Sequence, residues 1–133
     1  MKICVTASKD SLDAQVDPRF GRAAYFLIVD SDTMTFDSVP NTAAGAMSGA
    51  GIQAAQTMTN KGVEVLITGN VGPNAFQALA STGIKIVVGA DGTVREAIDK
   101  YKKGELKEAQ SPTVRGHHGM GKMGSQGMGR GQR

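Results

Sequence analysis

Cysteine is almost absent from this sequence, which has one, Cys4, among 133 residues. A single cysteine cannot form an intrachain disulfide, and it cannot supply the four thiolates that usually hold an iron–sulfur cluster. Because Cys4 stands between Ile3 and Val5 in a short apolar run, we expect it to be a buried structural residue. The sequence therefore predicts neither a disulfide framework nor a cluster held by cysteines.

Histidine is missing from the first 116 residues, since both histidines, His117 and His118, lie near the C-terminus. A Ser/His/Asp or Cys/His catalytic device would need that end of the chain to fold back onto the rest. We therefore expect no nucleophilic catalysis. Long apolar runs are missing too: residues 1–7 are too short for a signal peptide, and no segment has the length of a membrane span. A cytoplasmic protein is the expectation.

The body of the chain has no excess of charge of either sign. Residues 1–103 hold ten basic and ten acidic residues, whereas residues 104–133 hold five basic and two acidic ones, so the net charge of +3 comes from the C-terminal part. A neutral body argues against broad electrostatic binding to nucleic acid. The length fits one domain, which we place at residues 1–105, and residues 106–133 are expected to form a flexible tail rich in Gly, His and Met.

Apolar and glycine patterning predicts an α/β fold. Continuous or alternating apolar runs predict five strands, at residues 2–8, 24–30, 34–39, 63–67 and 84–88. Helical spacing predicts three helices, at about 49–60, at 73–81 and from Thr93 to about Lys103, where Thr93 and Glu96 form a capping box. Three antiparallel strands followed by αβαβα give a five-stranded mixed sheet with helices on both faces, an order that resembles ribonuclease H-like folds.

Two glycine-rich turns that feed helices are candidate anion sites. One is Gly69-Asn70-Val71-Gly72-Pro73-Asn74, and the other runs from Asn41 to Gly51. A helix N-terminus offers unpaired N–H groups and partial positive charge, and glycines allow close approach to the backbone. The alternative is that both are ordinary strand-to-helix turns.

The segment Asp17-Pro18-Arg19-Phe20-Gly21-Arg22 is a third candidate. Two arginines three residues apart suit an oxyanion or a sulfur-rich anion. In the structural alternative, Asp17 pairs with Arg19 or Arg22, and Phe20 packs into the core. In the tail, His117, His118 and Met120 are ligand types that suit copper or nickel, although this glycine-rich tract also reads as a solubilising tail.

These segments together resemble the dinitrogenase iron–molybdenum cofactor biosynthesis family. The resemblance spans about residues 1–105 and rests on Met1-Lys2-Ile3, Thr6-Ala7-Ser8, Val16-Asp17-Pro18-Arg19-Phe20-Gly21-Arg22, the turn from Asn41 to Gly51, and Thr68-Gly69-Asn70-Val71-Gly72-Pro73-Asn74-Ala75. It implies a ribonuclease H-like fold without nuclease activity. It also implies a non-enzymatic, nitrogen-fixation-related role in binding or carrying an anionic metal–sulfur cluster, whether iron–molybdenum cofactor-like or a sulfide of molybdenum, copper or iron.

The resemblance and the residue chemistry point to the same loops. A cluster donor or acceptor protein is the implied partner, with neither nucleic acid nor membrane expected, and covalent ligands of the cluster stay open. The predicted cluster-binding residues are Arg19, Phe20, Gly21, Arg22, Asn41, Gly49, Gly51, Gly69, Asn70, Gly72 and Asn74, and the predicted metal ligands in the tail are His117, His118 and Met120.

Two other functions remain open from the sequence. A regulatory or scaffold protein could bind a small phosphorylated ligand at the same turns. A metal-dependent nuclease would need clustered carboxylates, but the middle of the first strand carries Val5 and Thr6, and the helix at 49–60 has no acidic residue.

Overall fold

The computed structural model describes residues 1–41 and 50–112. These residues form a five-stranded sheet in the order β3-β2-β1-β4-β5. β1 pairs antiparallel with β2, and β2 with β3, while β1–β4 and β4–β5 pairs are parallel. The strands are β1 (Lys2–Ala7), β2 (Tyr25–Asp30), β3 (Phe36–Pro40), β4 (Val65–Ile67) and β5 (Lys85–Val87). The predicted fold class is confirmed.

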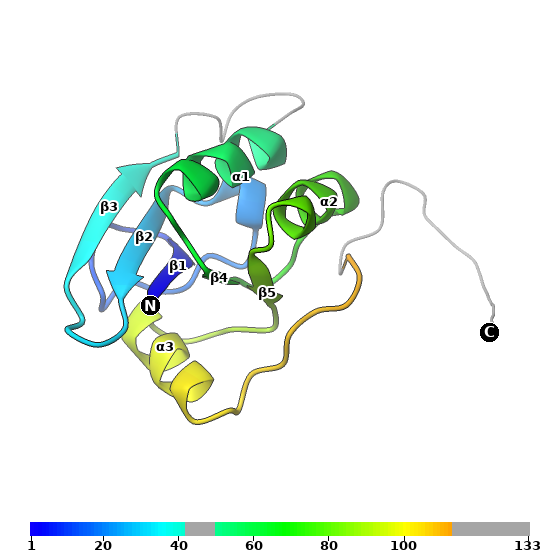
Figure 1. Ribbon diagram of the computed structural model, residues 1–133. Helices are drawn as coiled ribbons and strands as arrows, with labels where there is room; N and C mark the ends of the chain where they lie inside the picture. Colours follow the sequence, from blue (N-terminus) through cyan, green and yellow to red (C-terminus); the bar gives the residue numbers. More distant parts are fainter. Residues whose placement is uncertain (42–49, 113–133) are drawn as a thin grey trace.

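Helices cover both faces of the sheet (Figure 1). One face packs on α1 (Ala50–Asn60) and α2 (Pro73–Ser81) through a core that includes Cys4, Phe26, Leu66 and Leu79, and the other packs on α3 (Val94–Lys102) through a core that includes Val5, Leu27, Ile67 and Ile98. The alternation follows from the strand period of two residues, which sends neighbouring side chains to opposite faces. The four central residues of β2, Phe26 to Val29, are apolar and buried because both faces of the strand are covered.

The observed strands are shorter than the predicted ones, and the clearest difference concerns Met34. The sequence places Met34 in a strand, but the structure places it in the turn before β3, with φ of 60°. Asp30 causes this change: its Oδ1 accepts hydrogen bonds from the backbone N–H groups of Asp32 and Thr33, and its carbonyl accepts one from Met34. Such side-chain turns compete with strand pairing and are invisible to apolar periodicity.

The chain continues along the sheet beyond residue 105. Glu108 forms a bridge with Val87 on the free edge of β5, and the backbone N–H of Ala109 donates to the carbonyl oxygen of Ile86 at 2.7 Å. Residues 106–109 therefore pack on the sheet, although the sequence predicts a tail from residue 106. The tail residues His117, His118 and Met120, like Gly49, lie outside the described residues, and the division into domain and tail stays a prediction.

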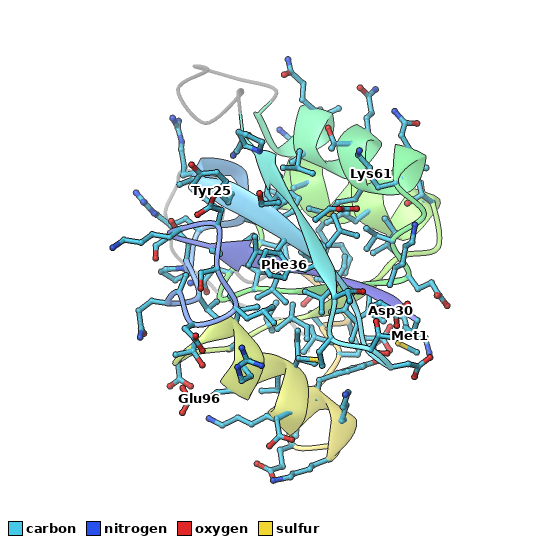
Figure 2. The ribbon with its side chains drawn as sticks, turned by 90° about the vertical axis from the view of Figure 1, so that its left-hand side faces the viewer. Met1, Tyr25, Asp30, Phe36, Lys61 and Glu96 are labelled. Carbon is cyan, nitrogen blue, oxygen red and sulfur yellow. The ribbon has the colours of Figure 1, made fainter. Side chains whose placement is uncertain are left out.

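Four strands end at one edge of the sheet. β1, β4 and β5 are mutually parallel, and β3 shares their direction because two antiparallel pairings separate it from β1. Tyr25, at the start of β2, and Glu96, at the start of α3, lie at this edge, whereas Met1, Asp30 and Lys61 lie at the opposite end (Figure 2). We call it the carboxyl edge; it is the usual location of ligand sites in α/β proteins. No helix among the described residues has the length and apolarity to span a membrane.

Candidate functional site

Two of the predicted segments are joined at the carboxyl edge. The backbone N–H of Asn70 donates to the carbonyl oxygen of Pro18 at 2.7 Å, and the N–H of Phe20 donates to the carbonyl oxygen of Asn70 at 3.4 Å. These bonds form a short parallel bridge, which we call the seam. The seam brings the arginine loop, residues 17–22, beside the turn that begins α2.

Gly69 makes the seam possible because it leaves room for Pro18. A Cβ atom at Gly69 would stand 2.6 Å from Pro18 Cα and 2.8 Å from the Pro18 carbonyl oxygen, distances that no side chain could occupy. The sequence predicts that Gly69 lets a ligand approach, but the space above it is filled by the protein itself. Gly72 differs, since no atom of residues 1–41 or 50–112 lies within 4 Å of the position of its missing Cβ.

Phe20 anchors the arginine loop from below. It begins the short 3-10 helix η1 (Phe20–Arg22), is 3% exposed, and its ring centroid lies 5.8 Å from that of Phe26 on β2. η1 also packs against α1 (Figure 1). The structural alternative for Phe20 is therefore correct: the ring belongs to the core and does not face the surface.

Asn41 fastens the other end of the loop. Its Nδ2 group donates to the carbonyl oxygens of Gly21 and Ala23 at 3.0 and 2.9 Å, and its backbone N–H donates to Ala24 at 3.0 Å. Gly21 and Asn41 thus bind each other. They shape the loop from the end of β3.

The two arginines extend outward from this anchored loop. Arg19 Nε lies 3.4 Å from Asp17 Oδ1, and its side chain is 67% exposed, while Arg22 is also exposed. An exposed ion pair of this length contributes little to stability. Because Asp17 contacts Arg19 through Nε, the terminal nitrogens of the guanidinium are left as the donors that a second anion would meet.

No side chain among the described residues caps the first turn of α2. Its N-cap is Gly72, which has no side chain to cap the helix, and Pro73 occupies the first helical position, where its missing N–H costs nothing. No acidic residue stands in the first turn, and Asn74 is exposed there. An uncapped N-terminus carries partial positive charge and N–H groups that point out of the helix. This turn adjoins the seam, so the arginine loop and the start of α2 lie at the same edge.

Comparison with known proteins identifies the family to which this fold belongs. Residues 1–104 match the family described as dinitrogenase iron-molybdenum cofactor. The chain belongs to this family. The apo form of the orange protein from Desulfovibrio gigas is 46% identical, with a TM-score of 0.82 over 85% of this chain and 96% of that one. A candidate NifB protein from Thermotoga is 39% identical, with a TM-score of 0.75 over 85% of this chain and 97% of that one.

A relative with lower sequence identity also matches over most of its length. An uncharacterised protein from Methanocaldococcus jannaschii is 29% identical over 111 residues, which cover 81% of this chain and 91% of its own. The likeness to these proteins spans nearly their whole length.

Within this family domain, the predicted residues fall into two groups. Phe20, Gly21, Asn41 and Gly69 are engaged with the protein itself and build the site. Arg19, Arg22, Asn70 and Asn74 are exposed, and Gly72 has open space in front of it. Gly51 is the second residue of α1. Sequence reasoning missed Pro18, whose carbonyl forms the seam, because a contact between residues 18 and 70 leaves no local pattern.

Cys4 does not take part in this site. It is fully buried, and burial raises the pKa of its thiol far above the usual range, so no thiolate is available as a ligand. The predicted burial is confirmed. Among residues 1–41 and 50–112, no group of three or more His, Cys, Asp or Glu side chains could hold a metal ion. The described part of the chain thus lacks the carboxylate cluster that a metal-dependent nuclease requires.

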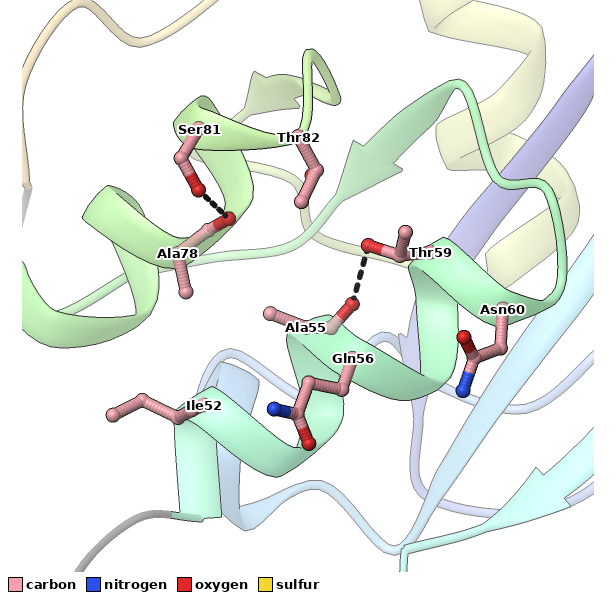
Figure 3. A pocket seen from close by; sticks show the side chains of 8 residues that line it. All are labelled: Ile52, Ala55, Gln56, Thr59, Asn60, Ala78, Ser81 and Thr82. Carbon is pink, nitrogen blue, oxygen red and sulfur yellow. Dashed lines mark hydrogen bonds between the residues drawn. The ribbon is translucent and has the colours of Figure 1, made fainter.

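A separate groove of about 430 Å³ lies between α1 and α2 (Figure 3). Its lining carries no charge and consists of Ile52, Ala55, Gln56, Thr59, Asn60, Ala78, Ser81 and Thr82. None of these residues belongs to the arginine loop or to the turn at 69–74. An uncharged lining does not suit an anion, whereas the arginine loop at the carboxyl edge carries two exposed guanidinium groups.

Proposed function

We propose that this protein binds and carries an anionic metal–sulfur cluster at the carboxyl edge, without catalysing a reaction on it. The observation that carries the proposal is the seam. It places two exposed arginines beside an uncapped helix N-terminus in a domain whose family is described by the iron–molybdenum cofactor. The cargo would be iron–molybdenum cofactor-like or a sulfide of molybdenum, copper or iron.

The chemistry of the exposed groups fits a polyanion with many sulfur atoms. Guanidinium groups donate to several acceptor atoms in a fixed planar geometry, and they are less strongly hydrated than ammonium groups. Backbone N–H groups at a helix end add donors that cannot lose their protons. Such a site holds an anion by hydrogen bonds and charge alone, so it needs neither His nor Cys as a ligand and allows the cargo to be released.

The first test is an anaerobic titration of the full-length apo protein with tetrathiomolybdate and Cu(I). Absorbance is followed, and bound metal is counted after desalting. We expect stoichiometric retention with defined charge-transfer bands. An apo protein that retains neither molybdenum nor copper, and that also takes up no iron sulfide, would contradict the proposal. Stabilisation by nucleotides but not by metal sulfides would instead favour a regulatory protein that binds a phosphorylated ligand.

A matched variant separates the carboxyl edge from the tail. Substituting His117→Ala, His118→Ala and Met120→Ala in the full chain removes the soft ligands near the C-terminus and leaves the arginine loop unchanged. We expect this variant to retain molybdenum as well as the wild type. Loss of all bound metal in this variant would place the cargo in the tail and not at the carboxyl edge.

A further inference from the structure

Two buried threonines lie beneath the arginine loop. Thr6 is near the end of β1, Thr68 directly follows β4, and neither has exposed surface. Their Oγ1 atoms are 2.8 Å apart, and Thr6 Oγ1 lies 2.6 Å from the backbone carbonyl oxygen of Asp17. Buried hydroxyl groups are costly unless they form hydrogen bonds. In the described part of the chain, only Ser31 joins these two as a buried polar side chain.

The direction of both bonds follows from counting protons. A carbonyl oxygen only accepts, so the single hydroxyl proton of Thr6 is donated to Asp17. The Thr6 oxygen must then accept from Thr68, whose own proton points toward it. The backbone N–H of Asp17 also donates to the carbonyl oxygen of Thr6 at 2.9 Å. Asp17 is thus held at two points by the same strand residue.

The Asp17 side chain in turn contacts Arg19. Its Oδ1 accepts from the backbone N–H of Arg19 at 3.0 Å and lies 3.4 Å from Arg19 Nε. The Asp17 side chain is 11% exposed, against 67% for Arg19. The well-packed carboxylate therefore fixes the base of an otherwise mobile side chain, and any shift of Asp17 would redirect the guanidinium.

We propose that Thr6 is a positioning residue of the anion site and that Thr68 is the buried donor to its hydroxyl oxygen. Their hydroxyl chain ties Asp17 to the ends of two neighbouring parallel strands, and through Asp17 it orients Arg19 toward the cargo. Both residues are fully buried, so neither touches the ligand. This inference rests on the proposed function, but the orientation of Arg19 can be measured without any ligand.

Isosteric valine variants separate a positioning role from a merely structural one. Thr6→Val removes the bond to Asp17 and also leaves the Thr68 proton buried without an acceptor, which is the most costly outcome. Thr68→Val leaves the Thr6–Asp17 bond intact. The double variant Thr6→Val/Thr68→Val leaves no buried donor unpaired, so it should regain much of the stability that Thr6→Val loses. In the double variant, however, the Asp17 carbonyl oxygen has lost the hydroxyl donor of residue 6, so Asp17 is held only by its backbone N–H bond to that residue.

The variants should therefore rank differently by melting temperature and by cluster affinity. We expect the melting temperature to fall most for Thr6→Val and less for the double variant. Tetrathiomolybdate and Cu(I) should bind about tenfold more weakly to both. Thr68→Val should bind within about twofold of wild type, and Thr6→Ser, which keeps the hydroxyl, should restore binding. Thr59→Val is the matched control, because its hydroxyl bonds only to Ala55 within α1.

The ligand-free measurement is the exchange of the Arg19 Nε proton with water, followed by NMR. We expect faster exchange in the double variant than in wild type or Thr68→Val. Unchanged exchange and unchanged cluster affinity in the double variant would overturn the positioning role. A binding loss that simply follows melting temperature across the series would also overturn it. If wild type itself retains no cluster, the proposed function fails, while the exchange measurement still decides on the threonines.

Discussion

α2 and α3 begin at the same edge of the sheet, yet their first turns are completed in opposite ways. At α3, the Thr93 side chain accepts from the N–H of Glu96, and the Glu96 carboxylate accepts from the N–H of Thr93, so the helix caps itself. At α2, Gly72 and Pro73 provide no cap and no acid. The capping box engages the N–H groups of Thr93 and Glu96, and the N–H groups of Val94 and Arg95 donate to the carbonyl oxygens of Ala14 and Leu12, both at 2.9 Å. The start of α3 therefore has no donors left for an anion, whereas the start of α2 has no side-chain cap and adjoins the arginine loop.

The difference shows that a helix N-terminus is not a site by default. Whether a helix N-terminus can bind an anion depends on the residues beside it. The seam brings the arginine loop beside the start of α2 and not beside the start of α3. On α3, the Glu96 carboxylate of the capping box would also repel an anion. Arg95 Nε lies 3.3 Å from Asp13 Oδ1 and is therefore already paired. Four sets of substitutions and one change of pH test this difference between α2 and α3.

Gly69→Ala should break the seam. The added methyl group would meet the backbone of Pro18 at 2.6 Å, and a backbone cannot move aside as a flexible side chain can. We expect the free energy of unfolding to fall by about 3 kcal/mol, measured by denaturant titration. Gly72→Ala is the matched control, since its added methyl group would meet none of the described residues, and it should cost about 1 kcal/mol or less as a poorer N-cap. Equal losses in the two variants would contradict the seam.

Arg19→Ala combined with Arg22→Ala should weaken cluster binding without unfolding the protein. Charge-assisted hydrogen bonds contribute about 1.5–3 kcal/mol, so we expect at least about tenfold weaker retention of tetrathiomolybdate and Cu(I). The Arg19 side chain is 67% exposed, and the Asp17 carboxylate keeps its bond from the backbone N–H of residue 19, so loss of this ion pair should change stability by about 0.5 kcal/mol or less. Arg95→Ala is the control, because it removes a similar exposed pair beside α3. A large drop in melting temperature without ligand would instead make the two arginines structural.

Gly72→Asp should convert α2 into a helix that resembles α3. The carboxylate would cap the first turn and complement the helix dipole, which stabilises the apo protein by about 0.5–1 kcal/mol. The same charge should weaken cluster binding. Gly72→Asn provides the neutral cap, so the difference between the two variants isolates the charge. The account fails here if Gly72→Asp binds cluster as tightly as wild type.

Thr93→Ala should affect stability alone. It removes the side-chain half of the capping box at α3, and loss of an N-cap hydroxyl costs about 1 kcal/mol. Because this turn holds no ligand in our account, cluster binding should stay within about twofold of wild type. Reduced binding in Thr93→Ala at unchanged stability would show that α3 takes part in the site.

Acid should weaken the cap of α3 but not the first turn of α2. The hydrogen bond from the Thr93 backbone N–H lowers the pKa of Glu96. A lowered pKa means that ionised Glu96 stabilises the fold above the ordinary glutamate range, and that this contribution is lost as the pH falls through that range. The Thr93 amide resonance should report the loss by NMR. Glu96→Gln should abolish this pH dependence, and an unchanged profile in that variant would refute the assignment.

Local chemistry explains which parts of this molecule could be predicted from the sequence. The capping box at Thr93 and the Pro73 start of α2 were predicted correctly, because both depend on residues within one turn. The buried strands were predicted within one or two residues from continuous apolarity. The position of Met34 was wrong, because the turn depends on a hydrogen bond to Asp30 that periodicity does not encode.

The site itself could be predicted only in part. The arginine loop and the turn at 69–74 were identified from composition, but their joining was not, since it depends on residues about fifty apart in sequence. For the same reason we interpreted the missing side chain of Gly69 as space for a ligand, whereas Pro18 occupies that space. Thr6 and Thr68 gave no signal, because a single threonine in a strand is ordinary until its partner is known.

The most direct test of the central claim is an amide NMR comparison of apo protein and protein loaded with tetrathiomolybdate and Cu(I). The account predicts that the largest shifts fall on Arg19, Asn70 and Asn74, around the seam and the first turn of α2, with little change at Thr93 and Glu96. Shifts concentrated at the start of α3, or confined to the residues after Pro112, would contradict it.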